Sequence, residues 1–416
     1  MSARKPLHLF DAYGIELEYM LVDRRSLSVM PVADELLKKA HGRYTNDHTA
    51  AGGIGWSNEL VCHVLELRNE RPEPHLDTLK NRFAGSVRTL NKLASAWGAM
   101  LMPAAMHPWM DPAKETRLWP HEAREIYAQF DKIFSCRRHG WANLQSCQIN
   151  LPFCGDKEFA RLHAAVRIVL PLLPALASSS PLMDGQTHGR INNRLAVYRS
   201  NSGKIPSITG DCIPEKVHSH KEYQTKILDP IYRGLKFHDP DGVLRHEWVN
   251  ARGAIARFDR HAVEIRIMDM QECPAADIAV CKAVIAVIRA LVEENFSDFT
   301  AQDAFSSGRL VSLLDLAGCG GELAVIRDRR YLALLGFLSE KKMTLRKLWL
   351  HLLEKTFPPN TAGDRDDLKT LRTILKEGVL SRRILRAAKN DFSRGSLREI
   401  YFELCRCLAE GRQFHA

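Results

Sequence analysis

Residues 14–22 alternate between apolar and polar positions and contain two glutamates two positions apart. The alternation predicts a β-strand whose apolar face carries Ile15, Leu17, Tyr19 and Leu21. Glu16 and Glu18 then share the other face, roughly 6.5–7 Å apart along the strand. Two carboxylates that close in a packed domain repel each other and resist desolvation unless a cation lies between them. We therefore expect this face to bind a hard divalent cation such as Mg²⁺, which takes carboxylate oxygens together with substrate phosphates.

Three further segments show the alternation of a strand, and each has one apolar and one polar side. The first, residues 60–68, follows Glu59 and carries Glu66; because this separation is odd, a bulge or bend is needed if both are to share a face. The polar sides of the other two segments, residues 143–151 and 262–269, carry Gln148 and Asn150, and Glu264 and Arg266. If the four strands are neighbours in one sheet, their polar sides form an acidic floor that also bears arginine.

A sheet surface that simply faces solvent would alternate in the same way. Solvent-facing surfaces, however, usually mix in Lys, Thr and Ser, whereas three of these four strands carry Glu and no lysine interrupts them. We therefore favour a site for two or three Mg²⁺ ions that clamp the β and γ phosphates of a nucleotide.

Helical spacing of apolar residues dominates much of the remaining chain. It predicts helices over residues 31–40, over 76–93 with Gly98 closing the helix, after Asp156 as a cap, and after Pro274. Residues 200–250 are rich in Pro, Gly, His and Asp and indicate long loops around short structured pieces, and such loops often cover active sites.

From about residue 300 onward the sequence predicts helices only, over residues 310–316, 341–355, 365–376 and 381–389. Asp364 and Gly378 are expected to cap the third of these. Because the strands lack regular βαβ alternation, we expect an α+β fold with a mainly antiparallel sheet and helices packed on it. We divide the chain into a catalytic domain over residues 1–298 and an all-helical C-terminal region over 299–416.

Composition places the chain among ordinary soluble proteins and excludes a membrane-spanning one. The most apolar stretch, residues 168–177, is too short to cross a bilayer and contains Pro171 and Pro174. No apolar signal region follows the first residues, and the ten cysteines lack a framework spacing, so we expect a cytoplasmic protein with reduced thiols.

The formal charge of +10 favours acidic partners. Nucleic acid is one option, but the basic residues are dispersed and mixed with acids, and those near Arg382 and Arg386 lack interleaved aromatics. A phosphorylated small molecule and a simply solvated basic surface remain alternatives, and the sequence leaves homo-oligomer formation open. The sequence contains no P-loop and no nucleophile elbow, and the pair His218 and His220 is expected to be incidental.

Five short motifs, in order, resemble those of a known family. Residues 14–18 (GIELE) resemble the Gly-x-Glu-x-Glu signature of the glutamate–cysteine ligase type 2 family, carboxylate–amine ligases of the glutamine-synthetase-like superfamily. The resemblance continues through Glu59 and Glu66, residues 106–108 (MHP), the stretch from Ser179 to Arg194, and residues 263–266 (VEIR) followed by Asp269. Together the motifs cover roughly residues 8–295.

The resemblance implies an ATP-dependent ligase that activates a carboxylate as an acyl phosphate, which an amine then attacks with release of phosphate. By this likeness the metal ligands, for Mg²⁺ or Mn²⁺, would be Glu16, Glu18, Glu59, Glu66, Gln148 and Glu264. Arg266 would meet the transferring phosphate, and Arg194 and Asn150 would hold the acid substrate. The expected partners are small molecules: ATP, glutamate or a similar acid, and an amine such as cysteine.

One position departs from the family pattern. The family usually has His-x-His where this chain has Gln148, Ile149 and Asn150, and the first of those histidines is a metal ligand in relatives. Gln148 offers a carbonyl oxygen that Mg²⁺ accepts. Two other hypotheses stay open: a phosphotransferase that releases a phosphorylated product without an amine, and a nucleotide-binding or nucleic-acid-binding relative without catalysis.

Overall fold

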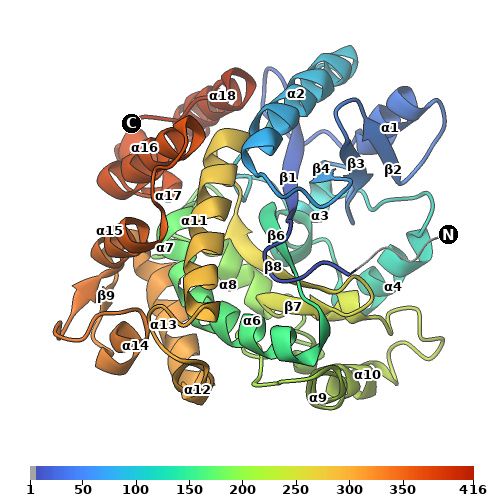
Figure 1. Ribbon diagram of the computed structural model, residues 1–416. Helices are drawn as coiled ribbons and strands as arrows, with labels where there is room; N and C mark the ends of the chain where they lie inside the picture. Colours follow the sequence, from blue (N-terminus) through green and yellow to red (C-terminus); the bar gives the residue numbers. More distant parts are fainter. Residues whose placement is uncertain (1–5) are drawn as a thin grey trace.

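The centre of the fold is a sheet in which every strand pairing is antiparallel. The computed structural model describes residues 6–416, and within them this sheet has eight strands in the order β2-β3-β4-β1-β6-β8-β7, with β5 paired to β1. The strands are β1 Gly14–Asp23, β2 Asp47–Ala50, β3 Ile54–Asn58, β4 Val64–Asn69, β5 Ala99–Met102, β6 Ser146–Pro152, β7 Ala254–Arg257 and β8 Ala262–Asp269. Figure 1 shows helices packed around this sheet, which confirms the expected α+β class.

The four strands predicted from alternation are β4, β1, β6 and β8, and they are consecutive neighbours in the sheet. Two of them begin later than expected. The segment predicted over residues 60–68 starts as a turn, with Leu21 donating its backbone N–H to the His63 carbonyl at 2.7 Å, and becomes β4 only at Val64. β6 begins at Ser146, because residues 139–142 form a short helix that Asn143 ends; the Asn143 side chain is bonded to the backbone of His107.

Four strands were not predicted: β2, β3, β5 and β7. All are only four or five residues long, too short for alternation to stand out. The hairpin of β2 and β3 turns at Gly52 and Gly53, whose φ angles of +87° and +70° suit glycine. Two adjacent glycines between short apolar runs are a hairpin signal that could have revealed this pair.

The apolar face of the sheet is covered by α2 Asp77–Ala94, α6 Gly155–Val169 and α11 Pro274–Val292. Ile15, Leu17 and Tyr19 on this face are fully buried. The thiols of Cys147 on β6 and Cys281 on α11 lie 3.4 Å apart, which places α11 directly against this side of the sheet. In Figure 1, α11 crosses in front of the strands. The face that carries the glutamates is therefore the opposite one.

Shorter helices complete the first 300 residues. They are α1 Ala33–His41, α3 Pro112–Glu115, α4 Arg124–Phe134, α5 His139–Ala142, α7 Pro174–Ala177, α8 Asn193–Ser200, α9 His220–Tyr223 and α10 Asp229–Leu235. A π-helical segment, Gln224–Leu228, joins α9 to α10. The region predicted as long loops, residues 200–250, is thus partly wrong, because it contains a continuous helical stretch from His220 to Leu235.

Two predicted helix caps are corrected. Asp156 lies inside the first turn of α6, and its side chain accepts the backbone N–H of His220 at 2.9 Å instead of capping its own helix. Asp364 is the third residue of its helix and forms a capping box with Thr361, which is the true N-cap. Gly98 and Gly378 do close their helices as predicted.

The C-terminal region is helical, with one small exception. Its helices are α12 Phe299–Ala304, α13 Ser307–Gly320, α14 Arg329–Leu334, α15 Leu345–Thr356, α16 Ala362–Glu377, α17 Leu380–Ala388 and α18 Arg394–Glu410. The exception is a two-stranded sheet of β9 Val325–Ile326 and β10 Met343–Thr344, which corrects the expectation of helices only. The main buried core runs from Tyr13 to Leu408 and includes residues on both sides of position 298. The division at 298/299 stays a prediction.

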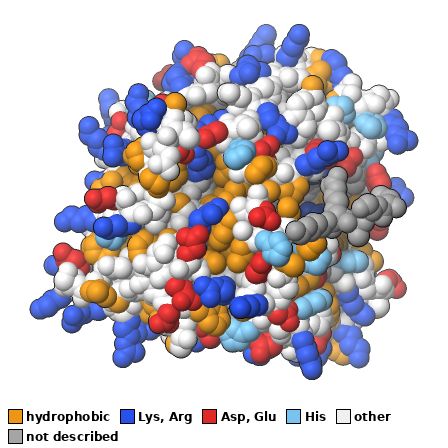
Figure 2. Space-filling view, in the orientation of Figure 1, with side chains coloured by type: hydrophobic (Ala, Val, Ile, Leu, Met, Phe, Trp, Pro, Cys, Tyr) orange, Lys and Arg blue, Asp and Glu red, His pale blue; other side chains and the backbone are white. Residues whose placement is uncertain are grey.

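The distribution of charged side chains on the surface agrees with the dispersed charge expected from the sequence. On the face in Figure 2, Lys and Arg side chains spread around the periphery and alternate with Asp and Glu. Within residues 6–416, none of the helices has the length and apolar character needed to cross a membrane.

Candidate active site

The polar faces of four neighbouring strands meet to form the acidic floor, which we define by Glu16, Glu18, Glu66, Gln148, Asn150, Glu264 and Arg266 on the strands, with Glu59 beside them. The strand register explains why these side chains lie close together. Glu18 of β1 lies opposite Glu66 of β4, and Glu16 lies opposite Gln148 of β6. Directly opposite residues of antiparallel strands share a face, so these side chains all project to one side. Asn150 is in turn opposite Glu264 of β8.

Glu59 joins the floor from a turn between β3 and β4. One carboxylate oxygen from each of Glu18, Glu59 and Glu66 lies within 4.8 Å of the others. The turn after Glu59 supplies the bend that the odd spacing to Glu66 requires. The structure thus brings together three of the predicted ligands in one cluster.

Glu16 lies next to this cluster and is held by Asn150, whose side-chain nitrogen donates to Glu16 Oε1 at 3.0 Å. Burial raises the pKa of Glu16 well above its ordinary value, and the charges of Glu66 and Glu264 raise it further. Gly14 faces Asn150 across the strands, and a Cβ at this glycine would lie 3.0 Å from Asn150 Cβ. The glycine of the Gly-x-Glu-x-Glu motif therefore lets Asn150 approach β1.

Glu18 has a more polar environment than Glu16. Its carboxylate accepts the backbone N–H of Ser146 at 2.6 Å, the Ser146 hydroxyl at 2.9 Å and the amide of Gln148 at 2.8 Å. Burial raises the pKa of Glu18, while Arg194 and the Ser146 hydrogen bonds oppose that shift. For Glu59, burial and the charges of Glu18 and Glu66 raise the pKa well above its ordinary value. The floor is therefore rich in negative charge that is only partly compensated.

Arg266 lies at the edge of the floor, two residues after Glu264 on β8. Its Nε is 2.8 Å from Glu264 Oε1, and one terminal nitrogen donates to the Asn250 carbonyl at 3.0 Å. Burial would lower the pKa of Arg266, but Glu264 and the other neighbouring groups raise it above its ordinary value. The guanidinium therefore stays charged and a quarter of its side chain remains exposed.

Arg194 of α8 is anchored to β8 by three contacts. Its terminal nitrogens donate to the carbonyls of Arg266 and Met268 at 2.9 and 3.3 Å, and one lies 3.4 Å from the Asp269 carboxylate. Asp269 also accepts from the Ser179 backbone at 2.9 Å and the Ser180 hydroxyl at 2.7 Å. Within residues 6–416, the buried Nε of Arg194 has no hydrogen-bond partner. The two motif segments thus join in one network that does not use every N–H of Arg194.

A cavity of about 390 Å³ opens above the floor. Glu18, Glu59, Gln148, Arg194 and Arg266 line one side of it. The other side is largely aromatic and apolar, with Ile126, Tyr127, Phe130, Trp141, Tyr198 and Trp248. The acidic floor is therefore the base of a pocket large enough for small-molecule substrates.

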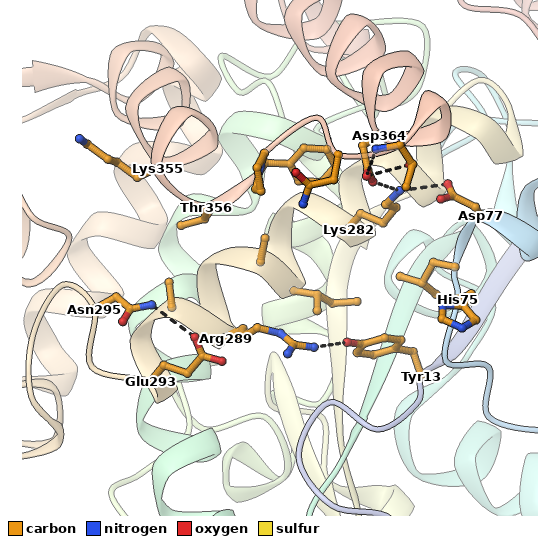
Figure 3. Close-up of a pocket in the computed structure, with 18 of the residues that line it drawn as sticks. Tyr13, His75, Asp77, Lys282, Arg289, Glu293, Asn295, Lys355, Thr356 and Asp364 are labelled. Atoms are coloured by element: carbon orange, nitrogen blue, oxygen red, sulfur yellow. Dashed lines mark hydrogen bonds and ion pairs between the residues drawn. The ribbon is translucent and has the colours of Figure 1, made fainter.

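A larger pocket of about 770 Å³ lies elsewhere, along α11, the start of α2 and the segment after α15 (Figure 3). Two of its basic side chains are held by neighbouring residues: Lys282 binds Asp77 at 3.0 Å and Asp364 at 2.8 Å, and Arg289 donates to the Tyr13 hydroxyl at 2.9 Å. Because Cys281 faces the sheet and Lys282 and Arg289 face this pocket, α11 separates it from the floor. We interpret it as a groove between packed segments.

The chemistry of the floor fits a hard divalent cation. All the clustered donor atoms are carboxylate oxygens, which Mg²⁺ and Mn²⁺ accept, and no thiol lines the cavity within the described residues 6–416. Buried carboxylates this close are costly unless a cation or protons compensate them. Gln148 is the exception among the expected ligands, since its amide nitrogen is turned toward Glu18.

Several residues of the site were not predicted from the sequence. Ser146 lies two positions before Gln148 and could have been found from alternation, as could Arg68, which lies two positions after Glu66 and contacts it at 3.3 Å. The aromatic side of the cavity comes from segments far apart in the chain and has no local signal.

The histidines noted in the sequence lie outside the floor. His107 binds the Leu27 carbonyl at 2.7 Å, and burial lowers its pKa to about 4, so it is a neutral structural residue. His218 pairs with Asp303 at 3.0 Å, and His220 stacks on Phe258 with the ring centroids 4.1 Å apart. The expectation that this pair is incidental agrees with these separate partners.

Comparison with known proteins now decides the family. The model of glutamate–cysteine ligase family 2 (GCS2) matches residues 12–403 of this chain. The chain belongs to this family. The resemblance carried by the five motifs is thereby confirmed, and the match extends beyond residue 295, where the motifs end. Family membership supports a carboxylate–amine ligase.

Two relatives illustrate the range of similarity. A protein of Archaeoglobus fulgidus, named only as uncharacterized, is 34% identical over 395 residues, which cover 95% of this chain and 98% of that protein. A protein of Rubrobacter xylanophilus, provisionally named glutamate–cysteine ligase 2-3, is 24% identical over 345 residues, or 74% of this chain and 86% of that protein.

Two crystal structures share the fold. Glutamate–cysteine ligase from Francisella tularensis, in complex with AMP, matches with a TM-score of 0.62 at 12% identity, over 98% of this chain and 90% of that one. A bifunctional glutathione synthetase from Pasteurella multocida matches with a TM-score of 0.59 at 13% identity, over 95% of this chain. The match covers 53% of the Pasteurella protein, so this chain corresponds to about half of it.

Proposed function

We propose that this chain is an ATP-dependent ligase that joins glutamate, or a glutamate-like acid, to an amine through an acyl phosphate, with release of ADP and phosphate. The observation that carries the proposal is the cluster of Glu18, Glu59 and Glu66 at the base of a cavity that Arg194 and Arg266 also line. A relative named as a glutamate–cysteine ligase and a fold neighbour crystallised with AMP support a nucleotide and an acid as substrates.

The reaction needs activation because a carboxylate is a poor electrophile. A side-chain carboxylate oxygen of the acid attacks the γ-phosphorus of ATP, and ADP leaves. The amine nitrogen then attacks the acyl carbon, phosphate leaves with the former carboxylate oxygen, and the nitrogen loses a proton. Bound Mg²⁺ or Mn²⁺ would neutralise the charges between phosphate and carboxylate.

The residues of the floor divide these tasks. Glu16, Glu18, Glu59, Glu66 and Glu264 offer the carboxylates that would hold the cations, with the Gln148 carbonyl oxygen as a further candidate. Arg266, charged and oriented by Glu264, would stabilise the transferring phosphoryl group.

Two further residues would hold the acid substrate. Arg194 keeps N–H groups that its contacts to β8 do not use, the buried Nε among them, and these donors would bind the α-carboxylate of the acid. Asn150 would act from β6, where its amide already positions Glu16.

The test is incubation of the purified chain with ATP, Mg²⁺ and a panel of amino acids, with hydroxylamine present to trap an acyl phosphate. We expect a hydroxamate with glutamate and transfer of ¹⁸O from its side-chain carboxylate to phosphate. Stoichiometric release of a phosphorylated product without any amine would instead establish the phosphotransferase. Absence of ATP consumption with every acid would contradict both activities.

A further inference from the structure

The aromatic side of the cavity, which we call the aromatic wall, consists of Tyr127, Phe130, Trp141 and Trp248. From it we infer the class of the amine: the acceptor is an amine with a flat apolar body and no carboxylate group. The inference rests on the proposed function and concerns only which amine the site accepts.

The wall is rigid and preformed. Phe130 packs against Trp141 and Trp248 with ring centroids 5.2 and 6.0 Å apart. Phe134 stacks on Trp141 with the ring centroids 5.3 Å apart, and His246 stacks on Trp248 at 5.3 Å. Because neighbours on several elements fix these rings, the wall can bind a ligand at a low cost in side-chain entropy.

Protein groups bond the polar atoms of two of the wall residues. Trp141 donates its ring N–H to the Asn201 carbonyl at 3.2 Å, and the Tyr127 hydroxyl accepts the Asn58 amide at 2.8 Å. Asn201 in turn donates to the Gly140 carbonyl at 2.9 Å, which ties α5 to α8. The wall therefore offers its apolar surface to a ligand, and half-buried aromatic surface inside a cavity is typical of an apolar binding site.

The charges of the cavity exclude a second carboxylate. Among the described residues 6–416, Arg194 and Arg266 are the only cations that line it. Arg266 pairs with Glu264, Arg194 pairs with Asp269, and their remaining capacity is needed for the phosphate and the acid substrate. The α-carboxylate of cysteine, or of any amino acid acceptor, would find no free basic side chain at the wall.

The junction of the floor and the wall suits the amino group of such an acceptor. Glu59 lies beside Tyr127 at the junction of the floor and the wall, since Asn58, which holds the Tyr127 hydroxyl, directly precedes it. The ammonium form of the amine is attracted to the aromatic rings at this junction, and it must lose one proton before its nitrogen attacks the acyl carbon. A carboxylate-free arylalkylamine satisfies both halves of the cavity.

The experiment compares four acceptors in the presence of ATP, Mg²⁺ and glutamate. Phenethylamine has the ring and the amine, phenylalanine adds only the α-carboxylate, ethylamine lacks the ring, and cysteine is the family's best-known acceptor. Product mass and ADP release give kcat/KM for each. We expect phenethylamine to exceed each of the other three by about tenfold or more.

A variant of the wall tests the location of the binding site. Trp248→Leu should raise the KM for phenethylamine, relative to the KM for hydroxylamine, by about tenfold, because hydroxylamine is too small to use the wall. Phe237→Leu changes an exposed aromatic residue that does not line the cavity and should keep the wild-type ratio. Quenching of tryptophan fluorescence by phenethylamine in the wild-type protein with Mg²⁺, glutamate and a non-hydrolysable ATP analogue measures binding without turnover.

The outcomes separate the two proposals. If hydroxylamine traps a glutamyl hydroxamate but cysteine or phenylalanine is used as well as phenethylamine, the acceptor class is wrong and the ligase proposal stands. If no acid gives a hydroxamate and no amine supports ADP release, the ligase proposal fails and the acceptor role fails with it. An unchanged KM ratio in a folded Trp248→Leu protein also overturns the acceptor site.

Discussion

The side-chain nitrogen of Gln148 donates a hydrogen bond to Oε1 of Glu18 over 2.8 Å. The same nitrogen lies 3.1 Å from the Ser146 hydroxyl, so the amide is oriented by two partners. A histidine at this position, as the family pattern has it, would offer a ring nitrogen to a cation. Here the amide keeps Glu18 in place, and its carbonyl oxygen is the atom that remains for a hard cation.

Gln148→His should change which metal the protein prefers. Imidazole nitrogen binds Mn²⁺ more readily than it binds Mg²⁺, whereas an amide oxygen suits Mg²⁺. We expect the ratio of ATP turnover with Mn²⁺ to turnover with Mg²⁺ to rise in the variant. Gln413→His, near the C-terminus, adds an imidazole without touching the floor and should leave the ratio unchanged. An equal ratio in wild type and Gln148→His would show that this position does not contact the metal.

Glu59→Gln should have opposite effects on stability and on activity, because the carboxylate cluster destabilises the metal-free protein but is needed to bind cations. Since burial and the neighbouring charges of Glu18 and Glu66 disfavour the ionised form of Glu59, neutralising it should stabilise the metal-free protein by about 1 kcal/mol. The same change should lower ATP turnover by about 100-fold and reduce the rise in Tm on adding Mg²⁺.

Thermal unfolding with EDTA and with Mg²⁺, together with an ADP assay, measures these effects. Glu125→Gln, on the exposed surface of α4, is the matched control and should behave as wild type. A Glu59→Gln protein with an undiminished response to Mg²⁺ would argue against a cation site at Glu59.

Arg266→Lys should lower kcat far more than it changes the KM for ATP. Arg266 uses its Nε for Glu264 and a terminal nitrogen for the Asn250 carbonyl, so its planar group can hold both partners and still face the cavity. A lysine ammonium cannot keep this geometry. We expect kcat to fall by about 100-fold, as for the loss of one group that stabilises transition-state charge.

Arg260→Lys, on the exposed turn before β8, controls for the change of residue type. A rise in KM with unchanged kcat would instead place Arg266 in ground-state binding of ATP.

Much of the fold and of the floor could be predicted because strand alternation carries that information. In β1 and β8 one face is apolar except at the last residue, so pairs such as Glu16 and Glu18 are visible as the polar face. That the polar faces adjoin depends on strand order, which alternation alone does not determine. The family motifs supplied the expectation that these residues share one metal site.

The parts that sequence could not predict depend on contacts between distant segments. The wall joins α4, α5 and Trp248, more than 100 positions away from Tyr127, and none of these has a pattern that marks it as part of a site. The role of Asp156 illustrates the same limit, because its partner His220 lies 64 residues away. Tertiary contacts decide such cases, and local propensity does not.

Acid should destabilise the protein through buried histidines away from the floor, and His163 on α6 is the clearest case. It is 2% exposed, and its Nε2 has no hydrogen-bond partner within residues 6–416. Burial lowers its pKa from 6.5 to about 3, and the charges of Arg167, His218 and Arg252 act in the same direction. Because the folded protein binds this proton less readily than the unfolded chain, the stabilisation is present above pH 6.5 and is lost as the pH falls toward 3.

Replacing this histidine should therefore flatten the acid limb of the stability profile. Between pH 6.5 and 5 the wild-type protein should lose about 2 kcal/mol of unfolding free energy through His163, which His163→Leu should keep. Urea unfolding at several pH values measures the difference, and His188→Leu, at an exposed turn, serves as control. If both variants lose stability with the same slope as wild type, His163 is protonated in the folded state and the burial argument fails.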